Sequence, residues 1–141
     1  MTVATSVALR VFGLLVLGTV LSGCQHPHRE PLNAIDWRTS PLDLNLRGMN
    51  GKSYLLRCPA GKPLPGSVTG SGPYTDASSI CAAAAHAGAL DAQRGGTVMI
   101  RILPGRNSYS GTIRNFIQSM EYMHPWGGSF GVLSRASRRR G

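Results

Sequence analysis

The sequence predicts an α+β domain with one buried helix and short, irregular strands around it. Residues 80–87, rich in alanine, are the clearest helical segment, and residues 97–103 are the clearest strand segment. Glycine occurs 18 times and proline 9 times in the 141 residues, and both residues interrupt regular elements. The 118 residues from Cys24 onward suffice for one small domain.

The predicted helix has recognisable ends. Asp76, Ser78 and Ser79 are residue types that begin helices, and the segment from Ile80 to Ala87 supplies strong helix formers. Gly88 suits the left-handed position that follows a helix C-terminus. Side chains as small as alanine let other elements approach closely, so we expect the helix to be buried.

Three segments predict strands. Residues 52–57 alternate weakly between polar and apolar, residues 97–103 are rich in β-formers, and residues 128–133 close the domain. The pairs Gly95-Gly96 and Pro104-Gly105 predict turns at the two ends of the middle segment.

The first 23 residues predict an export signal. Arg10 is the only charged side chain before Cys24, an apolar run covers residues 11–20, and Leu21-Ser22-Gly23-Cys24 follows. A transmembrane helix needs ~20 apolar residues, so this shorter run is typical of a cleaved signal peptide. The tetrapeptide resembles the lipobox of bacterial lipoproteins, in which the cysteine sulfur carries fatty acyl chains such as palmitate. The alternative is an ordinary signal peptide with a coincidental cysteine.

The remaining chain divides into three predicted parts. Residues 24–41 are polar and hold three prolines, which predicts a tether between the lipid and the domain. Trp37 is the exception, because a large apolar ring favours docking on the domain. Residues 42–133 form the predicted domain, and residues 134–141 form a basic tail expected to be disordered.

The net charge is +9, and it becomes +8 without the leader. Half of the latter comes from the tail arginines Arg135, Arg138, Arg139 and Arg140. Behind an export signal the available polyanions are lipid headgroups, lipopolysaccharide phosphates and acidic wall polymers, and we expect no nucleic-acid partner. The alternative is that the tail is only a solvated end.

Two thiols remain once Cys24 is assigned to lipid. In an oxidising compartment Cys58 and Cys81 are expected to form one disulfide. Loop-closure entropy for this spacing predicts a stabilisation of roughly 3 kcal/mol.

Residues 58–130 contain a series of motifs in an order that is typical of one protein family. The most specific motif runs from Tyr74 to Gly88. The supporting motifs are Cys58-Pro59-Ala60-Gly61, Val68, Gly70, Gly95-Gly96, Pro104-Gly105, Tyr109-Ser110-Gly111, Asn115, Ser119, Trp126, Ser129 and Phe130. In these residues the sequence resembles the LCCL domain family. The resemblance implies an α+β fold in which a central helix is wrapped by irregular antiparallel strands.

Two positions depart from the family pattern. Four-cysteine members carry cysteine where this chain has Lys62, together with another upstream, and they place the counterparts of Cys58 and Cys81 in different bridges. A Cys58–Cys81 bond is therefore a rewired one. In the family, glycine often follows the asparagine that corresponds to Asn115. This chain has Phe116 at that position, which puts the formation of the turn at Asn115 in doubt.

Catalytic and metal sites are poorly supported. The segment Gly127 to Gly131 matches G-x-S-x-G, but no acid or histidine follows it, as a hydrolase triad would require. Cys81 and His86 are five residues apart, on different helix faces, and four histidines with six acids form no metal-ligand pattern. We expect no catalytic residue, no metal and no cofactor, and a structural role for His86 near the helix end.

Recognition is the remaining function. Arg101, Arg106 and Arg114 flank Tyr109, which combines guanidinium donors with an aromatic face suited to anionic sugars. The alternative is that Tyr109 fills the core and the arginines are solvated. The resemblance implies an extracellular binding module, with lipopolysaccharide or carbohydrate as ligand.

The leading hypothesis is a non-enzymatic, envelope-anchored module that binds a glycan, lipopolysaccharide or a protein partner. The second is a structural accessory of an envelope protein assembly without a small ligand. A hydrolase is disfavoured because acids are scarce. Gln25 after the lipidated cysteine resembles the signal for the periplasmic face of the outer membrane, in a cell that has one.

Overall fold

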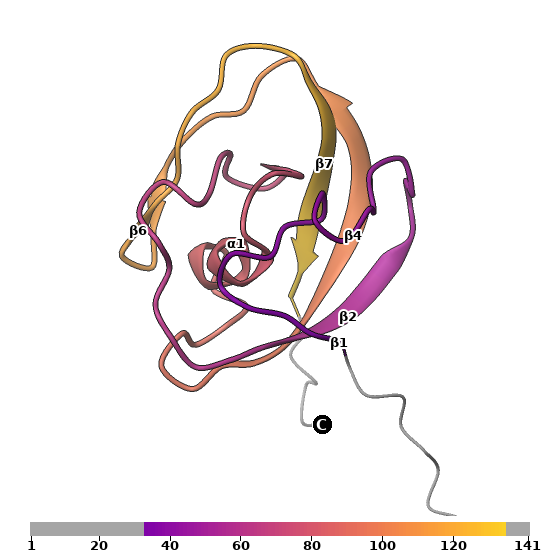
Figure 1. Cartoon of the computed structure of the whole chain (residues 1–141). Helices are drawn as coiled ribbons and strands as arrows, with labels where there is room; N and C mark the ends of the chain where they lie inside the picture. The colour runs from indigo at the N-terminus through magenta and orange to yellow at the C-terminus, as the bar shows by residue number, and fades with distance from the viewer. Residues whose placement is uncertain (1–32, 135–141) are drawn as a thin grey trace, which may run out of the picture.

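The computed structural model describes residues 33–134, which form one five-stranded sheet, one helix and one small hairpin (Figure 1). The elements are β1 (Asn33–Ala34), β2 (Ser53–Cys58), β3 (Tyr74–Thr75), α1 (Ile80–His86), β4 (Gly96–Arg106), β5 (Ile113–Arg114), β6 (Ile117–Gln118) and β7 (Trp126–Leu133). The predicted signal peptide, the lipid site Cys24, residues 24–32 of the tether and tail residues 135–141 lie outside the described residues.

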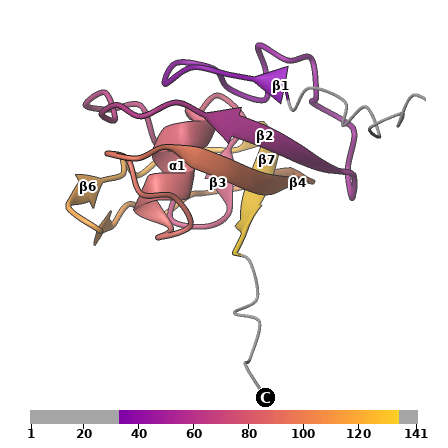
Figure 2. The same cartoon turned by 90° about the horizontal axis from the view of Figure 1, so that it is seen from below.

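The large sheet has the strand order β1-β2-β4-β7-β3 (Figure 2). The pairs β2–β4, β4–β7 and β3–β7 are antiparallel, whereas β1 runs parallel to β2. The sheet is therefore mixed, which the expectation of purely antiparallel strands did not include.

Strand β4 is longer than predicted and passes straight through Pro104-Gly105. The predicted turn there is wrong, because Pro104 pairs with Gly128 of β7 on one side only. On the other side, the β2 pairing ends at Arg101, so no β2 carbonyl opposite Pro104 needs the missing N–H donor.

Helix α1 begins and ends where the sequence predicts. The Ser79 hydroxyl accepts a hydrogen bond from the amide of Ala82 at 3.1 Å, and Gly88 adopts the left-handed φ of +79° after the last turn. All seven helical residues are buried. The helix contacts β4 on one side and β6 on the other, as Figure 1 shows. In the described part of the chain, no helix has the length and apolar character to cross a membrane.

The two faces of the sheet differ in polarity. Leu56, Val98, Ile100, Ile102 and Phe130 are buried in one core with the helix alanines. On the outer face Leu55 and Met99 are exposed and Leu133 is half-buried, and the cross-strand register places these three in one row. In β2 and β4 the alternation of buried and exposed residues has the period of two expected for a sheet buried on one face.

Residues 33–41 belong to the fold, which corrects the predicted tether over residues 24–41. Ile35 donates its amide hydrogen to the carbonyl of Arg57 at 3.0 Å, and Ser40 and Pro41 are buried. Trp37 packs so closely on Gly61 that a Cβ at Gly61 would lie 2.2 Å from the indole nitrogen. Parallel pairing with β2 and this aromatic contact outweigh the polar composition that suggested a tether.

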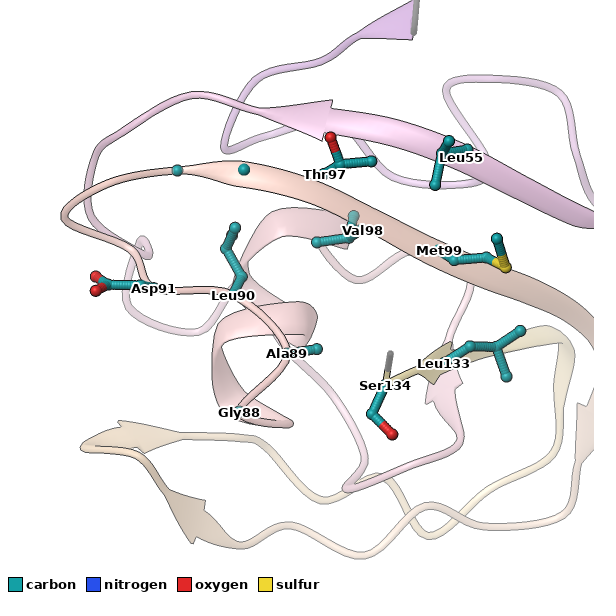
Figure 3. Close-up of a pocket in the computed structure, with 12 residues that line it drawn as sticks. Leu55, Gly88, Ala89, Leu90, Asp91, Thr97, Val98, Met99, Leu133 and Ser134 are labelled. Atoms are coloured by element: carbon teal, nitrogen blue, oxygen red, sulfur yellow. The ribbon is translucent and has the colours of Figure 1, made fainter. Parts of the chain in front are cut away.

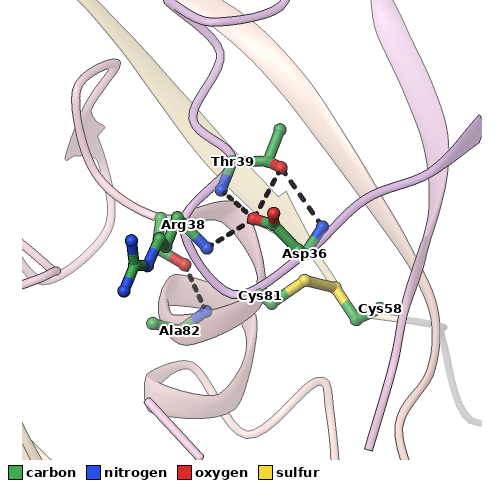
Figure 4. Close-up of a disulfide and its surroundings, with 7 residues drawn as sticks. Asp36, Arg38, Thr39, Cys58, Cys81 and Ala82 are labelled. Atoms are coloured by element: carbon green, nitrogen blue, oxygen red, sulfur yellow. Dashed lines mark hydrogen bonds between the residues drawn. A yellow bond between two sulfur atoms is a disulfide. The ribbon is translucent and has the colours of Figure 1, made fainter. Parts of the chain in front are cut away.

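The predicted disulfide between Cys58 and Cys81 is confirmed, with an S–S distance of 2.06 Å (Figure 4). Cys58 ends β2 and Cys81 lies in the first turn of α1, and both are fully buried. The bridge therefore fastens the helix to the sheet. The turn formed by Asp36 and Thr39 lies beside it, closed by hydrogen bonds from the Thr39 amide and hydroxyl to Asp36 Oδ1 at 2.9 and 3.0 Å.

Candidate functional site

The three arginines predicted to bind a ligand are divided between strand β4 and the β5–β6 hairpin. Arg101 is exposed on the outer face of β4, where its Nε lies 3.4 Å from the Ser53 hydroxyl. Arg106 is exposed at the end of the same strand, opposite Trp126 of β7. Arg114 lies on β5 and donates a hydrogen bond to the carbonyl of Ser71 at 2.9 Å. No contact between any two of these arginines is seen in the described structure.

Tyr109 is not the exposed aromatic face that the sequence suggested. Its side chain is 2% exposed, which leaves no ring surface for a sugar. Its hydroxyl accepts a hydrogen bond from the Arg106 amide at 3.1 Å and faces the Gly128 carbonyl at 3.4 Å. Its backbone exchanges two hydrogen bonds of 2.8 Å with Tyr122. Tyr109 therefore positions Arg106 and Tyr122 from below the surface.

The structure gathers a different set of side chains around Trp126, which we call the aromatic–arginine cluster: Arg47, Arg106, Tyr122, His124 and Trp126. The rings of Tyr122 and Trp126 meet edge to face with centroids 5.7 Å apart, and His124 lies 5.5 Å from Tyr122. The Arg47 guanidinium carbon lies 5.5 Å from the centre of the Trp126 ring. Arg106 and Trp126 are direct cross-strand partners, so their side chains leave the same face.

A buried carboxylate holds this cluster together. Asp76 is 0% exposed and accepts two hydrogen bonds from Arg47, at 2.7 Å from Nε and 2.8 Å from Nη2. Its Oδ1 also accepts a hydrogen bond of 2.7 Å from the indole nitrogen of Trp126. The hydrogen bonds to Asp76 raise the pKa of Arg47. Both the guanidinium and the indole are therefore fixed before any ligand arrives.

The electrostatics of the cluster leave one positive charge in excess. Arg47 balances the charge of Asp76, but its Nη1 takes part in neither of their two hydrogen bonds. Arg106 has no carboxylate partner in the described residues. Only glycine fits at position 128 next to Asp76, because a Cβ at Gly128 would lie 2.1 Å from Asp76 Oδ2.

His86 lies in a closed network next to the helix end. Its Nε2 lies 3.3 Å from the Thr112 carbonyl and 3.2 Å from the Thr112 hydroxyl, and its Nδ1 lies 2.9 Å from the Tyr74 hydroxyl. Burial lowers the pKa of His86, against the hydrogen bond to Thr112. The side chain is 0% exposed, so a ligand at the surface would not contact it.

The remaining chemical candidates are also accounted for by the fold. The G-x-S-x-G match lies inside strand β7, and the buried Ser129 hydroxyl donates to the Pro104 carbonyl at 2.6 Å. Cys81 is oxidised in the disulfide. Across residues 33–134, no three His, Cys, Asp or Glu side chains are placed to hold a metal ion.

A cavity of about 550 Å³ lies between the start of β4, the end of β7 and the loop after α1 (Figure 3). Leu55, Leu90, Val98, Met99 and Leu133 are the larger apolar residues that line it, and Asp91, paired with Arg94 at 2.7 Å, is the one charged residue among those that line it. A cavity lined by no cationic side chain is a poor site for an anion. The aromatic–arginine cluster is therefore the better site for a charged sugar.

Sequence reasoning found only part of this cluster. The sequence predicts Arg106 as a ligand-binding residue and Trp126 as a family match, but it does not predict a binding role for Arg47, Tyr122 or His124. Asp76 is 29 residues from Arg47 and 50 residues from Trp126. No local spacing signals contacts over such separations.

The family model of the LCCL domain matches residues 35–130 of this chain. The chain is 39% identical to cochlin from Bos taurus over 112 residues, which is 77% of this chain and 20% of that protein. It is 46% identical to cochlin from Cavia porcellus over 81 residues, 57% of this chain and 14% of that protein. It is 35% identical to vitrin from Mus musculus over 89 residues, 62% of this chain and 13% of that protein.

The matched segments are thus a small part of these longer relatives. The family model spans the fold from the residue after β1 to the middle of β7, including the helix, the disulfide and the buried Asp76. The chain belongs to the LCCL domain family.

Proposed function

We propose that this chain is a non-enzymatic binding module of the cell envelope, and that its aromatic–arginine cluster binds an anionic glycan such as the sugar phosphates of lipopolysaccharide. The observation that carries the proposal is the Arg47 guanidinium fixed over the Trp126 ring, with Arg106 beside it. Aromatic rings stack on sugar faces, and guanidinium groups donate paired hydrogen bonds to phosphate or carboxylate oxygens.

Preorganisation supports the choice of this surface. A flexible arginine loses side-chain entropy when it binds, whereas Asp76 already holds Arg47 through two hydrogen bonds. The ring of Trp126 is held by the same carboxylate. The exposed Arg106 adds the uncompensated charge that attracts an anion.

The sequence supports placement in the envelope. The apolar leader and the lipobox-like tetrapeptide predict export and acylation of Cys24, with Gln25 favouring the periplasmic face of an outer membrane. The fold offers little for catalysis, because Asp76, His86 and Ser129 are all buried and hydrogen-bonded. A binding role needs none of these groups to react.

Titration with the phosphorylated core oligosaccharide of lipopolysaccharide tests this function. Arg106→Gln and Tyr122→Leu should each weaken binding about tenfold, since one charge-assisted hydrogen bond or one stacked ring contributes this much. Arg57→Gln is the matched control, because it removes an equal charge from the outer face of β2. Equal weakening by Arg57→Gln would show that only net charge matters and would refute the site.

A second candidate function is a structural accessory of an envelope protein assembly, or a module for a protein partner. The row of Leu55, Met99 and Leu133 on the outer sheet face favours it, because Leu55 is 42% and Met99 41% exposed. Such an apolar row is typical of protein contacts. Two results together would favour this alternative. The chain would bind no glycan, and an envelope protein would co-purify with the wild type but not with Met99→Lys.

A further inference from the structure

The β5–β6 hairpin has an unusual turn. Its two turn residues, Asn115 and Phe116, have φ angles of +49° and +63°. A two-residue turn of this kind suits Asn followed by Gly, because only glycine adopts a positive φ without crowding its Cβ. Phenylalanine in this region is a genuine outlier. The turn that Phe116 put in doubt therefore does form, with Phe116 in the glycine position.

Packing does not account for Phe116. Its side chain is 104% exposed, so the ring has no protein neighbour that would offset the backbone strain. Its neighbours, in contrast, are held firmly. The Asn115 amide donates to the His86 carbonyl at 2.9 Å at the end of α1, and Ile117 packs against the core. A fixed turn thus presents a large apolar ring to the surroundings.

The surface around Phe116 is apolar with a cationic border. Ile113 is 73% exposed, Met120 48% and Leu64 42%. A groove of about 570 Å³ lies between Phe116 and the segment that contains Lys62 and Leu64, and none of the described residues that line it is acidic. Arg114 precedes the turn and is exposed. The hairpin stands on the far side of α1 from β4 and β7 (Figure 1).

We propose that Phe116 inserts into the interface of an anionic phospholipid membrane, with Lys62 and Arg114 at the level of the headgroups. An exposed aromatic ring beside cations matches the boundary between acyl chains and negative headgroups. The net charge of +8 without the leader complements such a surface. This surface shares no residue with the aromatic–arginine cluster, and the proposal does not depend on glycan binding.

The length of chain before the fold is compatible with this contact. Cys24 precedes Asn33 by nine residues, which reach at most about 30 Å when extended. A domain of about 100 residues has a radius of gyration of only about 13 Å. An acyl anchor at Cys24 would therefore keep the hairpin within reach of the same bilayer.

Vesicle binding by the chain from Gln25 to Gly141 tests the proposal. This form contains every described element, and it lacks the acyl chains that would dominate the measurement. The probe is vesicles of phosphatidylcholine and the anionic lipid phosphatidylglycerol in a ratio of about 3:1, which have a negative surface potential. Phe116→Gly should reduce partitioning about tenfold or more, since insertion of a phenyl ring contributes at least that factor. Met49→Ser removes a similarly apolar, 40% exposed side chain from the loop before β2 and should leave partitioning unchanged.

A fluorescent variant provides the second measurement. Phe116→Trp should retain binding and show a blue shift with vesicles after subtraction of the wild-type signal from Trp37 and Trp126. Equal partitioning of Phe116→Gly and wild type, or no partitioning of the wild type, overturns the proposal. The wild type could also dimerise with increasing concentration in the absence of vesicles. If Phe116→Gly abolishes such dimerisation, the surface around Phe116 binds a second copy of the chain, and the membrane proposal is overturned.

Discussion

Reduction of the Cys58–Cys81 bridge is the perturbation whose size the structure determines most directly. The bridge closes a loop with a sequence separation of 23 residues. The chain-entropy relation for such a loop gives about 3.4 kcal/mol of stabilisation, through restriction of the unfolded chain. For a small domain whose total stability is about 5–15 kcal/mol, this share is large.

Urea denaturation of the chain from Gln25 to Gly141, followed by intrinsic fluorescence, measures this effect. The oxidised protein and the same protein in reductant should differ by about 3 kcal/mol in the free energy of unfolding. This comparison keeps both sulfur atoms, so it separates the cross-link from core packing. The double variant Cys58→Ala/Cys81→Ala should be less stable still, because both sites are buried and the lost sulfur atoms leave space.

The double alanine variant is also the control for the reagent, since its stability should not respond to reductant. The entropic reasoning fails if oxidised and reduced wild type unfold within about 0.5 kcal/mol of each other. It fails as well if the reductant weakens the double variant as much as the wild type, because the effect would then not come from this bridge.

Four further predictions follow from the sequence and the structure. Burial places the folded-state pKa of His86 below its unfolded value of 6.5. The contribution of neutral His86 to the free energy of unfolding is therefore fully present above pH 6.5 and falls below it, by at most about 1.4 kcal/mol per pH unit. Urea midpoints at pH 7.5 and 5.5 should show this loss of stability, and His86→Gln should reduce the loss. Phe116→Gly should raise the free energy of unfolding by about 1 kcal/mol in thermal melts, because glycine removes the strain of a positive φ, and a stability loss would contradict the assigned strain. Cys24→Ala should yield protein without acyl chains, and an unmodified Cys24 thiol in mature wild type, found by intact mass spectrometry, would exclude lipidation. Deletion of residues 134–141 should flatten the salt dependence of binding to lipopolysaccharide, measured by calorimetry at two ionic strengths, whereas an unchanged response would identify the tail as a solvated end.

The local elements and the family can be predicted from short stretches of the sequence. Serine at the helix start, the alanine run and Gly88 specify α1, because capping and propensity depend on residues within one or two turns. The middle strand was located correctly, although its turn at Pro104 was wrong. The disulfide follows from chemistry, since two thiols remain once Cys24 is assigned to lipid and the leader predicts an oxidising compartment.

Which side chains meet and which are buried depends on contacts between segments that are far apart in the chain. Tyr109 looked like a binding ring in the sequence, but the Tyr122 and β7 segments close over it. Arg47 and Trp126 lie far apart in the chain and meet through Asp76, which becomes buried only when β3 pairs with β7. Phe116 is exposed because Asn115 anchors the turn to the helix end. Such contacts depend on how the sheet packs against α1. That packing is the sum of many weak contacts between distant parts of the chain, so no short stretch of sequence encodes it.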